Sequence, residues 1–232
     1  RAETGTDTGY RRCGGIYLAR TAGETAALAA WAETMCEEGV AVEKLLLADD
    51  GKNPSVGALS RNVTHSRQDY RQTSEIGAKS LQTVEPKVVI KPEAGGLSIR
   101  SAWLLPDECQ LRNPWYLKAL QKICAMRGVE IVPECEVTDF EIIGERVTGV
   151  ITTGGTVRAE EGCVTSGAWT GLLLQKLGLT LGVVPMRGQM VLFRSKRPVA
   201  THVINEGPRY LVPREDGRLL AGSTEEEAGF DK

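Results

Sequence analysis

The stretch that most constrains the fold of this chain runs from residue 137 to residue 177. Its first part contains three runs rich in β-branched residues, at 137–143, 147–152 and 156–158. Gly144-Glu145 and Gly154-Gly155 separate these runs. A glycine pair between two alternating runs is typical of a hairpin, because primed turns need positive φ. The pattern predicts a three-stranded antiparallel meander.

The second part of this stretch predicts a short buried strand that leads into a helix. Cys163-Val164-Thr165 has strand character, Ser166-Gly167 ends it, and a helix is expected from about Thr170 to Gly178. Open α/β sheets bind nucleotides and other anions at such strand-to-helix junctions, and a glycine lets a ligand approach the backbone closely. Residue types alone favour a simpler interpretation, in which the meander braces a helix and Gly167 is an ordinary turn glycine.

Composition excludes several classes of protein. The 232 residues suffice for one large or two modest domains, and 41% hydrophobic with 25% charged residues indicates a soluble chain with a core. A net charge of −2 argues against a nucleic-acid or anionic-membrane partner. We see no apolar run near the roughly 20 residues that span a bilayer and no signal peptide, so a cytoplasmic location is expected.

The cysteines and histidines do not predict a metal site. None of the six cysteines forms a Cys-x-x-Cys pair, and the two histidines have no second candidate ligand nearby in the sequence. Scattered cysteines of this kind favour free thiols over disulfides or zinc.

Elsewhere the sequence predicts helices joined to strands. A Thr21/Glu24 capping box and Gly39 bound one helix, and Asn113-Pro114 and Gly128 bound another. Asp216-Gly217 marks a hairpin. Strands are expected at 10–19, 95–100, 102–105, 129–132 and 183–193, with a loop and edge strand over 196–205. The polar segment 49–80 carries Arg61, Arg67 and Arg71, which predict a solvated face more strongly than an anion site.

Three motifs in this order resemble the D-amino-acid oxidase and glycine oxidase family of FAD enzymes. The meander followed by Thr165-Ser166-Gly167-Ala168-Trp169 is similar to the second half of the family's FAD-binding domain. Residues 184–191, VPMRGQMV, are similar to its Pro-x-Arg-Gly-Gln strand. Residues 210–225, YLVPREDGRLLAGSTE, are similar to its Tyr-Ile-Val-Pro-Arg block.

The resemblance implies a mixed α+β and α/β fold in two domains. Residues 1–110 and 183–232 would form a substrate domain built on an antiparallel sheet with helices, and 111–182 part of an FAD-binding domain. The sequence contains no Gly-x-Gly-x-x-Gly, the loop that holds the FAD pyrophosphate in this family. The family's substrate-carboxylate arginine and final glycine-rich segment are not found either. We therefore expect the chain to be an internal fragment of a longer oxidase.

The resemblance also implies site residues. Val137 matches a position whose backbone meets the adenine, Ser166 and Gly167 match the segment beside the FAD, and Tyr210 matches a pocket tyrosine that binds the substrate carboxylate or amine. The structural alternatives are a buried strand valine, a turn and a half-buried strand tyrosine. Arg187 is expected to brace its strand. Glu225 would favour cationic or small polar substrates if it faced the pocket, and it has no such role if it faces solvent.

The implied reaction is FAD-dependent oxidation of glycine or small D-amino acids to the imino or keto acid, with release of hydrogen peroxide. Such enzymes can supply thiamine biosynthesis. The expected partner is a small amino acid, and a homo-oligomer is left open. One alternative is an amino-acid or amine dehydrogenase that passes electrons to a quinone. Another is a non-catalytic flavoprotein-derived module, since the fragment alone is expected to be inactive.

Overall fold

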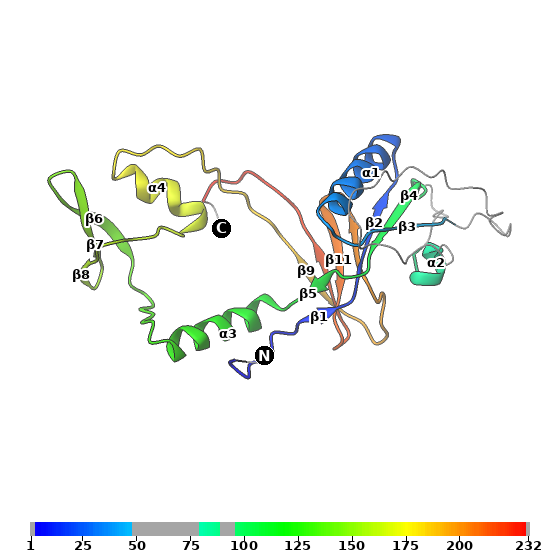
Figure 1. The fold of residues 1–232 in the computed structure, drawn as a ribbon, viewed down its shortest axis with the longest axis horizontal. Helices are drawn as coiled ribbons and strands as arrows, with labels where there is room; N and C mark the ends of the chain where they lie inside the picture. Colours follow the sequence, from blue (N-terminus) through cyan, green and yellow to red (C-terminus); the bar gives the residue numbers. More distant parts are fainter. Residues whose placement is uncertain (1–2, 48–78, 89–95, 231–232) are drawn as a thin grey trace, which may run out of the picture. The chain divides into compact units, whose positions relative to one another are not determined.

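The computed structural model describes residues 3–47, 79–88 and 96–230 (Figure 1). The chain divides into two units. One contains residues 9–111 and 190–223, and the other contains residues 1–8, 112–189 and 224–232. Arg61, Arg67 and Arg71 lie outside the described residues. The assignment of residues 1–110, 111–182 and 183–232 to substrate and cofactor domains remains a prediction.

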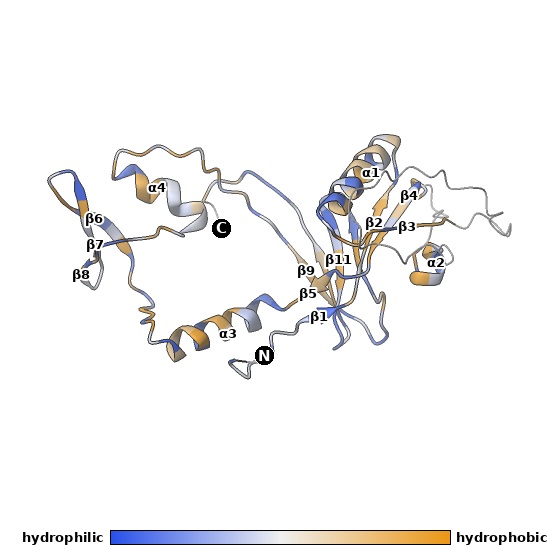
Figure 2. Cartoon of the chain, in the orientation of Figure 1, coloured by the Kyte–Doolittle hydropathy of each residue, from blue (hydrophilic) through white to orange (hydrophobic). Residues whose placement is uncertain are grey.

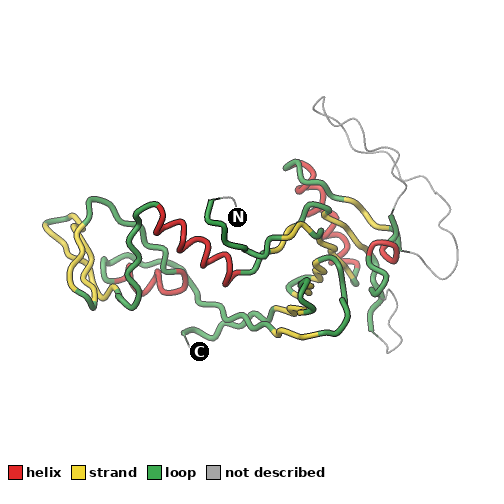
Figure 3. Tube along the Cα trace, turned by 90° about the horizontal axis from the view of Figure 1, so that it is seen from below, coloured by secondary structure: helices red, strands yellow, loops and turns green. Residues whose placement is uncertain are grey.

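The unit of residues 9–111 and 190–223 is built on a seven-stranded sheet (Figure 3). Neighbouring strands are antiparallel except β2 and β10, which are parallel. A separate pair joins β1 (Arg11–Arg12) to β5 (Cys109–Gln110). The order in the large sheet is β3 (Glu43–Leu45), β4 (Ser101–Leu105), β2 (Gly15–Ala19), β10 (Val203–Glu206), β11 (Arg209–Pro213), β12 (Arg218–Gly222) and β9 (Val191–Arg194).

Two helices accompany this sheet. The predicted capping box begins α1 (Ala22–Glu37): Glu24 N donates to Thr21 Oγ1 at 3.2 Å, and Thr21 N donates to Glu24 Oε2 at 3.0 Å. The Trp31 ring of α1 lies 4.5 Å from that of Tyr17 in β2, centroid to centroid. The shorter α2 (Leu81–Val84) has its first turn capped by Ser80.

The core of this unit lies on one face of the sheet. Alternation in β2 places Ile16 and Leu18 on that face, where both are buried. Figure 2 shows the apolar residues of β2 and β4 in orange. The core cluster consists of Ile16, Leu18, Leu45, Leu81, Ile99, Ala102 and Leu104. The opposite face carries Gly15, Tyr17 and Asn205, and it is the face that matters for the candidate site below.

The other unit contains the predicted meander and helices. Strands β6 (Val137–Ile143), β7 (Arg146–Thr152) and β8 (Gly155–Arg158) pair antiparallel in that order. Gly144, with a positive φ, lies in the first turn, and Gly155, also with a positive φ, begins β8 directly after the second turn at Thr153-Gly154. In the sequence, α3 (Asn113–Met126) precedes the meander. The 3₁₀ turn η1 (Gly167–Trp169) follows it and leads into α4 (Thr170–Gln175). The meander prediction and both helix predictions are confirmed.

Several predicted strands are wrong. Residues 129–132, 163–165 and 97–100 are not in strands, and only the end of 183–193 is, as β9. A strand needs a continuous ladder of backbone hydrogen bonds to a neighbour. In the described residues Arg100 N donates to Ala19 O and Arg187 bridges Glu226, and neither contact extends into a strand. The prediction of an edge strand within residues 196–205 is also wrong, because the strand found there is not at an edge. It is β10, in the middle of the sheet, because β2 pairs with it on its other side.

The cysteines and possible metal ligands can be located in the described residues. All six are free thiols, and no group of three or more histidine, cysteine or acidic side chains is placed to hold a metal ion in this part of the chain. Over the same residues, none of the helices combines the length and the apolar character that a membrane span requires.

Candidate functional site

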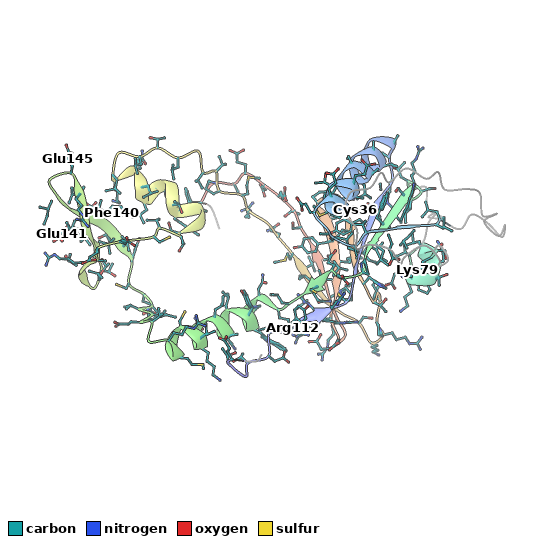
Figure 4. All side chains as sticks on the ribbon, in the orientation of Figure 1. Cys36, Lys79, Arg112, Phe140, Glu141 and Glu145 are labelled. Carbon is teal, nitrogen blue, oxygen red and sulfur yellow. The ribbon has the colours of Figure 1, made fainter. Side chains whose placement is uncertain are left out.

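The meander, the segment after it and α4 line a partly open cavity of about 630 Å³. Phe140 projects into it from β6, Val150 from β7, and Leu173 and Leu174 from α4. Figure 4 labels Phe140 on β6. The segment that was expected to be a strand, Cys163 to Thr165, instead forms part of the cavity wall. The lining is predominantly apolar, as small-molecule sites usually are.

The cavity wall contains acidic side chains, and the meander beside it contains an ion pair. Glu160 and Glu161 belong to the lining, and none of the described residues that line it is basic. Glu141, beside Phe140 in sequence, is not in the lining. Its carboxylate accepts from Arg158 Nε at 2.7 Å and from Arg158 Nη2 at 2.6 Å. These bonds from Arg158 hold the pKa of Glu141 below its usual value.

Two of the residues predicted to bind cofactor lie at this cavity. Val137, the first residue of β6, and Ser166 both belong to the lining. Ser166 Oγ lies 3.1 Å from Thr170 Oγ1, which ties the end of the segment to α4. Gly167 begins η1 with a φ of +56°, and an added Cβ would meet no atom within 4 Å. The structure thus brings Val137 and Ser166 to one cavity, with Gly167 next in the chain.

The residues of the cavity fit one end of FAD better than the other. Apolar walls suit the adenine ring, and a carboxylate can hydrogen-bond ribose hydroxyls. The pyrophosphate needs backbone N–H groups from a glycine-rich loop or basic side chains, and the lining contains Glu160 and Glu161 in place of basic residues. The cavity therefore fits the adenosine end of the cofactor.

Tyr210, the predicted substrate-contacting residue, lies in β11 of the seven-stranded sheet. It pairs with Asn205 of β10 on one side and Gly222 of β12 on the other. Its phenol lies against the Gly222 backbone: a Cβ added at Gly222 would come within 2.8 Å of Tyr210 Oη and 3.0 Å of Met190 Cγ. The absence of a side chain at residue 222 therefore allows the half-buried tyrosine ring to take this orientation.

Arg187 and Glu225 belong to two segments, 187–189 and 224–226, that are hydrogen-bonded to each other. Arg187 and Glu226 form an antiparallel bridge, and Arg187 Nη2 donates to Glu226 Oε2 at 2.7 Å. This arrangement supports the prediction that Arg187 braces its segment. Glu225 is exposed.

Sequence reasoning missed a polar group on the same sheet face as Tyr210. Glu108 follows β4, and its carboxyl group lies over Gly15, close to Tyr17 and Asn205. Within the predicted strand 10–19, the sequence contains the pair Gly14-Gly15. A glycine inside a strand also marks the close approach of another group, and this signal could have identified the site.

The fold of this chain is similar to that of solved amino-acid oxidoreductases. It resembles the crystal structure of glycine oxidase from Geobacillus kaustophilus, with a TM-score of 0.74 and 27% identity over 100% of this chain and 52% of that one. The similar L-proline dehydrogenase from P. horikoshii, at 16% identity and a TM-score of 0.74, shares the fold.

The family model described as "FAD dependent oxidoreductase" (DAO) matches residues 1–232, so the chain belongs to this family. The predicted family and its FAD cofactor are thereby confirmed. Glycine oxidase from Pseudomonas aeruginosa PAO1 is 29% identical over 247 residues, covering 100% of this chain and 65% of the relative. Glycine oxidase from Pseudomonas putida KT2440 is 38% identical over 138 residues, covering 59% of this chain and 38% of the relative. The chain thus spans less than two thirds of the length of these relatives.

Proposed function

We propose that the protein oxidises glycine or small D-amino acids to the corresponding imino or keto acid and releases hydrogen peroxide. The observation that carries this proposal is the match of the whole chain to the DAO family together with the similarity to glycine oxidases. The partner is accordingly a small amino acid. A cytoplasmic location, a homo-oligomeric state and a contribution to thiamine biosynthesis remain predictions.

In this proposal the chain's own residues bind and position cofactor and substrate. When bound, FAD supplies the acceptor for the two electrons and the hydrogen of the substrate α-carbon. Val137, Phe140 and Ser166 would hold the adenosine end in the cavity, and Gly167 would let that end approach the backbone. Tyr210 would donate its hydroxyl proton in a hydrogen bond to the substrate carboxylate. Such a mechanism requires no nucleophile or carboxylate pair from the protein.

Peroxide release tests the oxidase assignment directly. The full-length, flavin-loaded protein is incubated with glycine, sarcosine and D-alanine in air, and peroxide is measured with a coupled peroxidase. The proposal expects stoichiometric peroxide from at least one of these substrates. A protein that holds FAD but oxidises none of them would refute it.

A dehydrogenase is the second candidate, because D-amino acid dehydrogenase from Xylella fastidiosa M12 is 33% identical over 141 residues, covering 59% of this chain and 32% of the relative. Such an enzyme would reduce a soluble quinone analogue with a D-amino acid and would release little peroxide. The peroxide assay, repeated anaerobically with the quinone analogue, separates the two candidates. A third candidate, a non-catalytic module, would bind no FAD.

Replacing Tyr210 by phenylalanine should raise the KM for glycine roughly tenfold and change kcat less. The reason is that a hydrogen bond to a charged carboxylate contributes about 1.5–3 kcal/mol, while the ring that lies against Gly222 is kept. Steady-state kinetics of the full-length enzyme measure both constants. Tyr116→Phe, on exposed α3, is the matched control and should leave both unchanged. An unchanged KM in Tyr210→Phe would remove Tyr210 from the site.

A further inference from the structure

Another cavity, of about 460 Å³, lies at one end of the seven-stranded sheet. The described residues that line it come from the chain around the start of α1, from residues 96 and 97, and from the hairpin that joins β10 to β11. All of them belong to the unit of residues 9–111 and 190–223. This cavity therefore lies within one unit and is distinct from the apolar cavity beside the meander.

The position of this cavity follows from the parallel pair in the sheet. β2 and β10 run in the same direction, so both strands end at the same edge. Arg20 is the first residue after β2, and Glu206 is the last residue of β10. In open α/β sheets, the crevice outside the carboxyl ends of parallel strands is where ligands bind. The topology thus brings two charged side chains that are distant in sequence to a place suited to a ligand.

The lining of this cavity contains two charges of each sign. Four of its eight described residues are charged, namely Arg20, Glu24, Glu206 and Arg209. A ligand with a single charge would be repelled by half of these groups, whereas a ligand with both charges can face an opposite charge at each end. The balance of charge therefore favours a zwitterion over a simple anion or cation.

The two arginines share Glu206 unequally. Glu206 Oε2 accepts from Arg20 Nε at 2.8 Å, and Arg20 Nη1 also donates to the carbonyl oxygen of Leu97. Glu206 Oε1 lies 4.0 Å from Arg209 Nη1, which is too far for a hydrogen bond. The side chain of Arg209 is 78% exposed, so its guanidinium can turn toward a carboxylate in the cavity. Arg20 is thus fixed in place, and Arg209 is the adaptable donor.

The two carboxylates provide acceptors for an ammonium group. Glu24 Oε2 accepts from Arg20 N at 2.8 Å and from Thr21 N at 3.0 Å. These bonds hold the pKa of Glu24 below its usual value, so the group is charged at neutral pH. They use one oxygen of Glu24, as Arg20 Nε uses one oxygen of Glu206. The second oxygen of each carboxylate can therefore accept from a ligand.

We propose that this cavity is a second binding site for a small zwitterionic amino acid, whose carboxylate pairs with Arg209 and whose ammonium group faces Glu24 and Glu206. The site is separate from the one proposed for Tyr210. Arg209 and Tyr210 are consecutive in β11, so their side chains point to opposite faces of the sheet. Binding here requires no oxidation of the amino acid, so the inference does not depend on the proposed function.

The test measures the Kd of L-alanine for the full-length, flavin-loaded protein by isothermal titration calorimetry. L-alanine is a zwitterion, and as an L-amino acid it lies outside the proposed oxidase substrates. It should bind roughly fivefold more tightly than acetate or methylamine, each of which carries only one of its charges. Arg209→Gln should weaken L-alanine about fivefold, because an exposed ion pair with the ligand is lost.

Two further variants serve as controls for Arg209→Gln. Arg218→Gln removes the same charge from β12 of the same sheet, outside the cavity lining, and should leave the Kd of L-alanine unchanged. Tyr210→Phe should also leave it unchanged, because Tyr210 belongs to the other proposed site. Both controls keep a side chain of similar size at a partly exposed position.

The outcomes separate this inference from the proposed function. A protein that does not bind L-alanine, or that binds acetate equally well, would overturn the inference. So would an Arg209→Gln protein with the affinity of wild type, or an equal loss in Tyr210→Phe, which would indicate a single site. Peroxide release from glycine or D-alanine is measured in parallel. Its absence, together with binding of L-alanine that depends on Arg209, would count against the proposed function alone.

Discussion

Replacing Glu85 by alanine is expected to lower the free energy of unfolding by about 3 kcal/mol, because it removes a buried carboxylate that accepts several hydrogen bonds from Thr201 and His202. Glu85, which follows α2, is 2% exposed. Its Oε2 accepts from Thr201 N at 2.9 Å and Thr201 Oγ1 at 2.8 Å. It also lies 3.2 Å from His202 N and 3.1 Å from His202 Nδ1. One carboxylate thus joins α2 to the segment that leads into β10.

The same contacts predict how the contribution of Glu85 to the free energy of unfolding depends on pH. Burial alone would raise the pKa of Glu85, but the hydrogen bonds from Thr201 and His202 outweigh burial and lower the pKa below its ordinary value of 4.5. A carboxyl whose pKa is lower in the folded state stabilises the protein above its unfolded pKa. The contribution should therefore be full at neutral pH and decline as the pH falls below about 4.5 toward the lowered pKa.

Urea unfolding of the full-length protein at pH 7 and at pH 4 measures both effects. Glu33→Ala, at an exposed position on α1, is the matched control and should change stability by less than about 0.5 kcal/mol. The difference in free energy of unfolding between Glu85→Ala and wild type should be smaller at pH 4 than at pH 7. A Glu85→Ala protein as stable as Glu33→Ala at pH 7 would show that these hydrogen bonds do not stabilise the fold.

Val137→Asp is expected to weaken FAD binding about 100-fold, equivalent to roughly 2.7 kcal/mol. Val137 lines the cavity whose wall already contains Glu160 and Glu161. A further carboxylate there would have to lose water next to an adenine ring, or exclude the ring to stay hydrated, and either outcome costs affinity. Titration of the apoprotein with FAD, followed by quenching of flavin fluorescence, measures the change.

Ile143→Asp is the control for this substitution. Ile143 is on the same strand as Val137, is 65% exposed and does not belong to the cavity lining. The Ile143→Asp substitution adds the same charge to the same strand but outside the cavity. It should therefore leave the affinity for FAD within about twofold of wild type. Equal losses in the two variants would mean that the effect is not specific to the cavity.

Local signals in the sequence predicted local structure well. The Thr21/Glu24 capping box, Pro114 in the first turn of α3 and the glycines of the meander each act within a few residues, and each element formed where expected. Strands 129–132 and 163–165 failed because apolar alternation identifies a segment that could pair, without identifying its partner. The central place of β10 depends on a parallel neighbour, β2, that is distant in sequence.

The candidate sites also differ in how far the sequence could predict them. Val137 and Ser166 were assigned to one cofactor site by the family resemblance, and both line the same cavity. The Glu108 group could not be predicted, since it is formed by residues from β2, from the turn after β4 and from β10. The Gly14-Gly15 pair signals that something approaches the backbone, but the approaching group is nearly a hundred residues away in the sequence. Family resemblance supplied Tyr210, whereas residue types alone did not separate it from an ordinary strand tyrosine.

The most direct test of the central claim is the visible absorption spectrum of the purified full-length protein, recorded anaerobically before and after addition of glycine or D-alanine. The account predicts the bands of oxidised flavin at the start and their bleaching by one of these amino acids, with recovery when air is admitted. A protein without flavin bands after incubation with FAD, or one whose bands persist with every small amino acid, would contradict it.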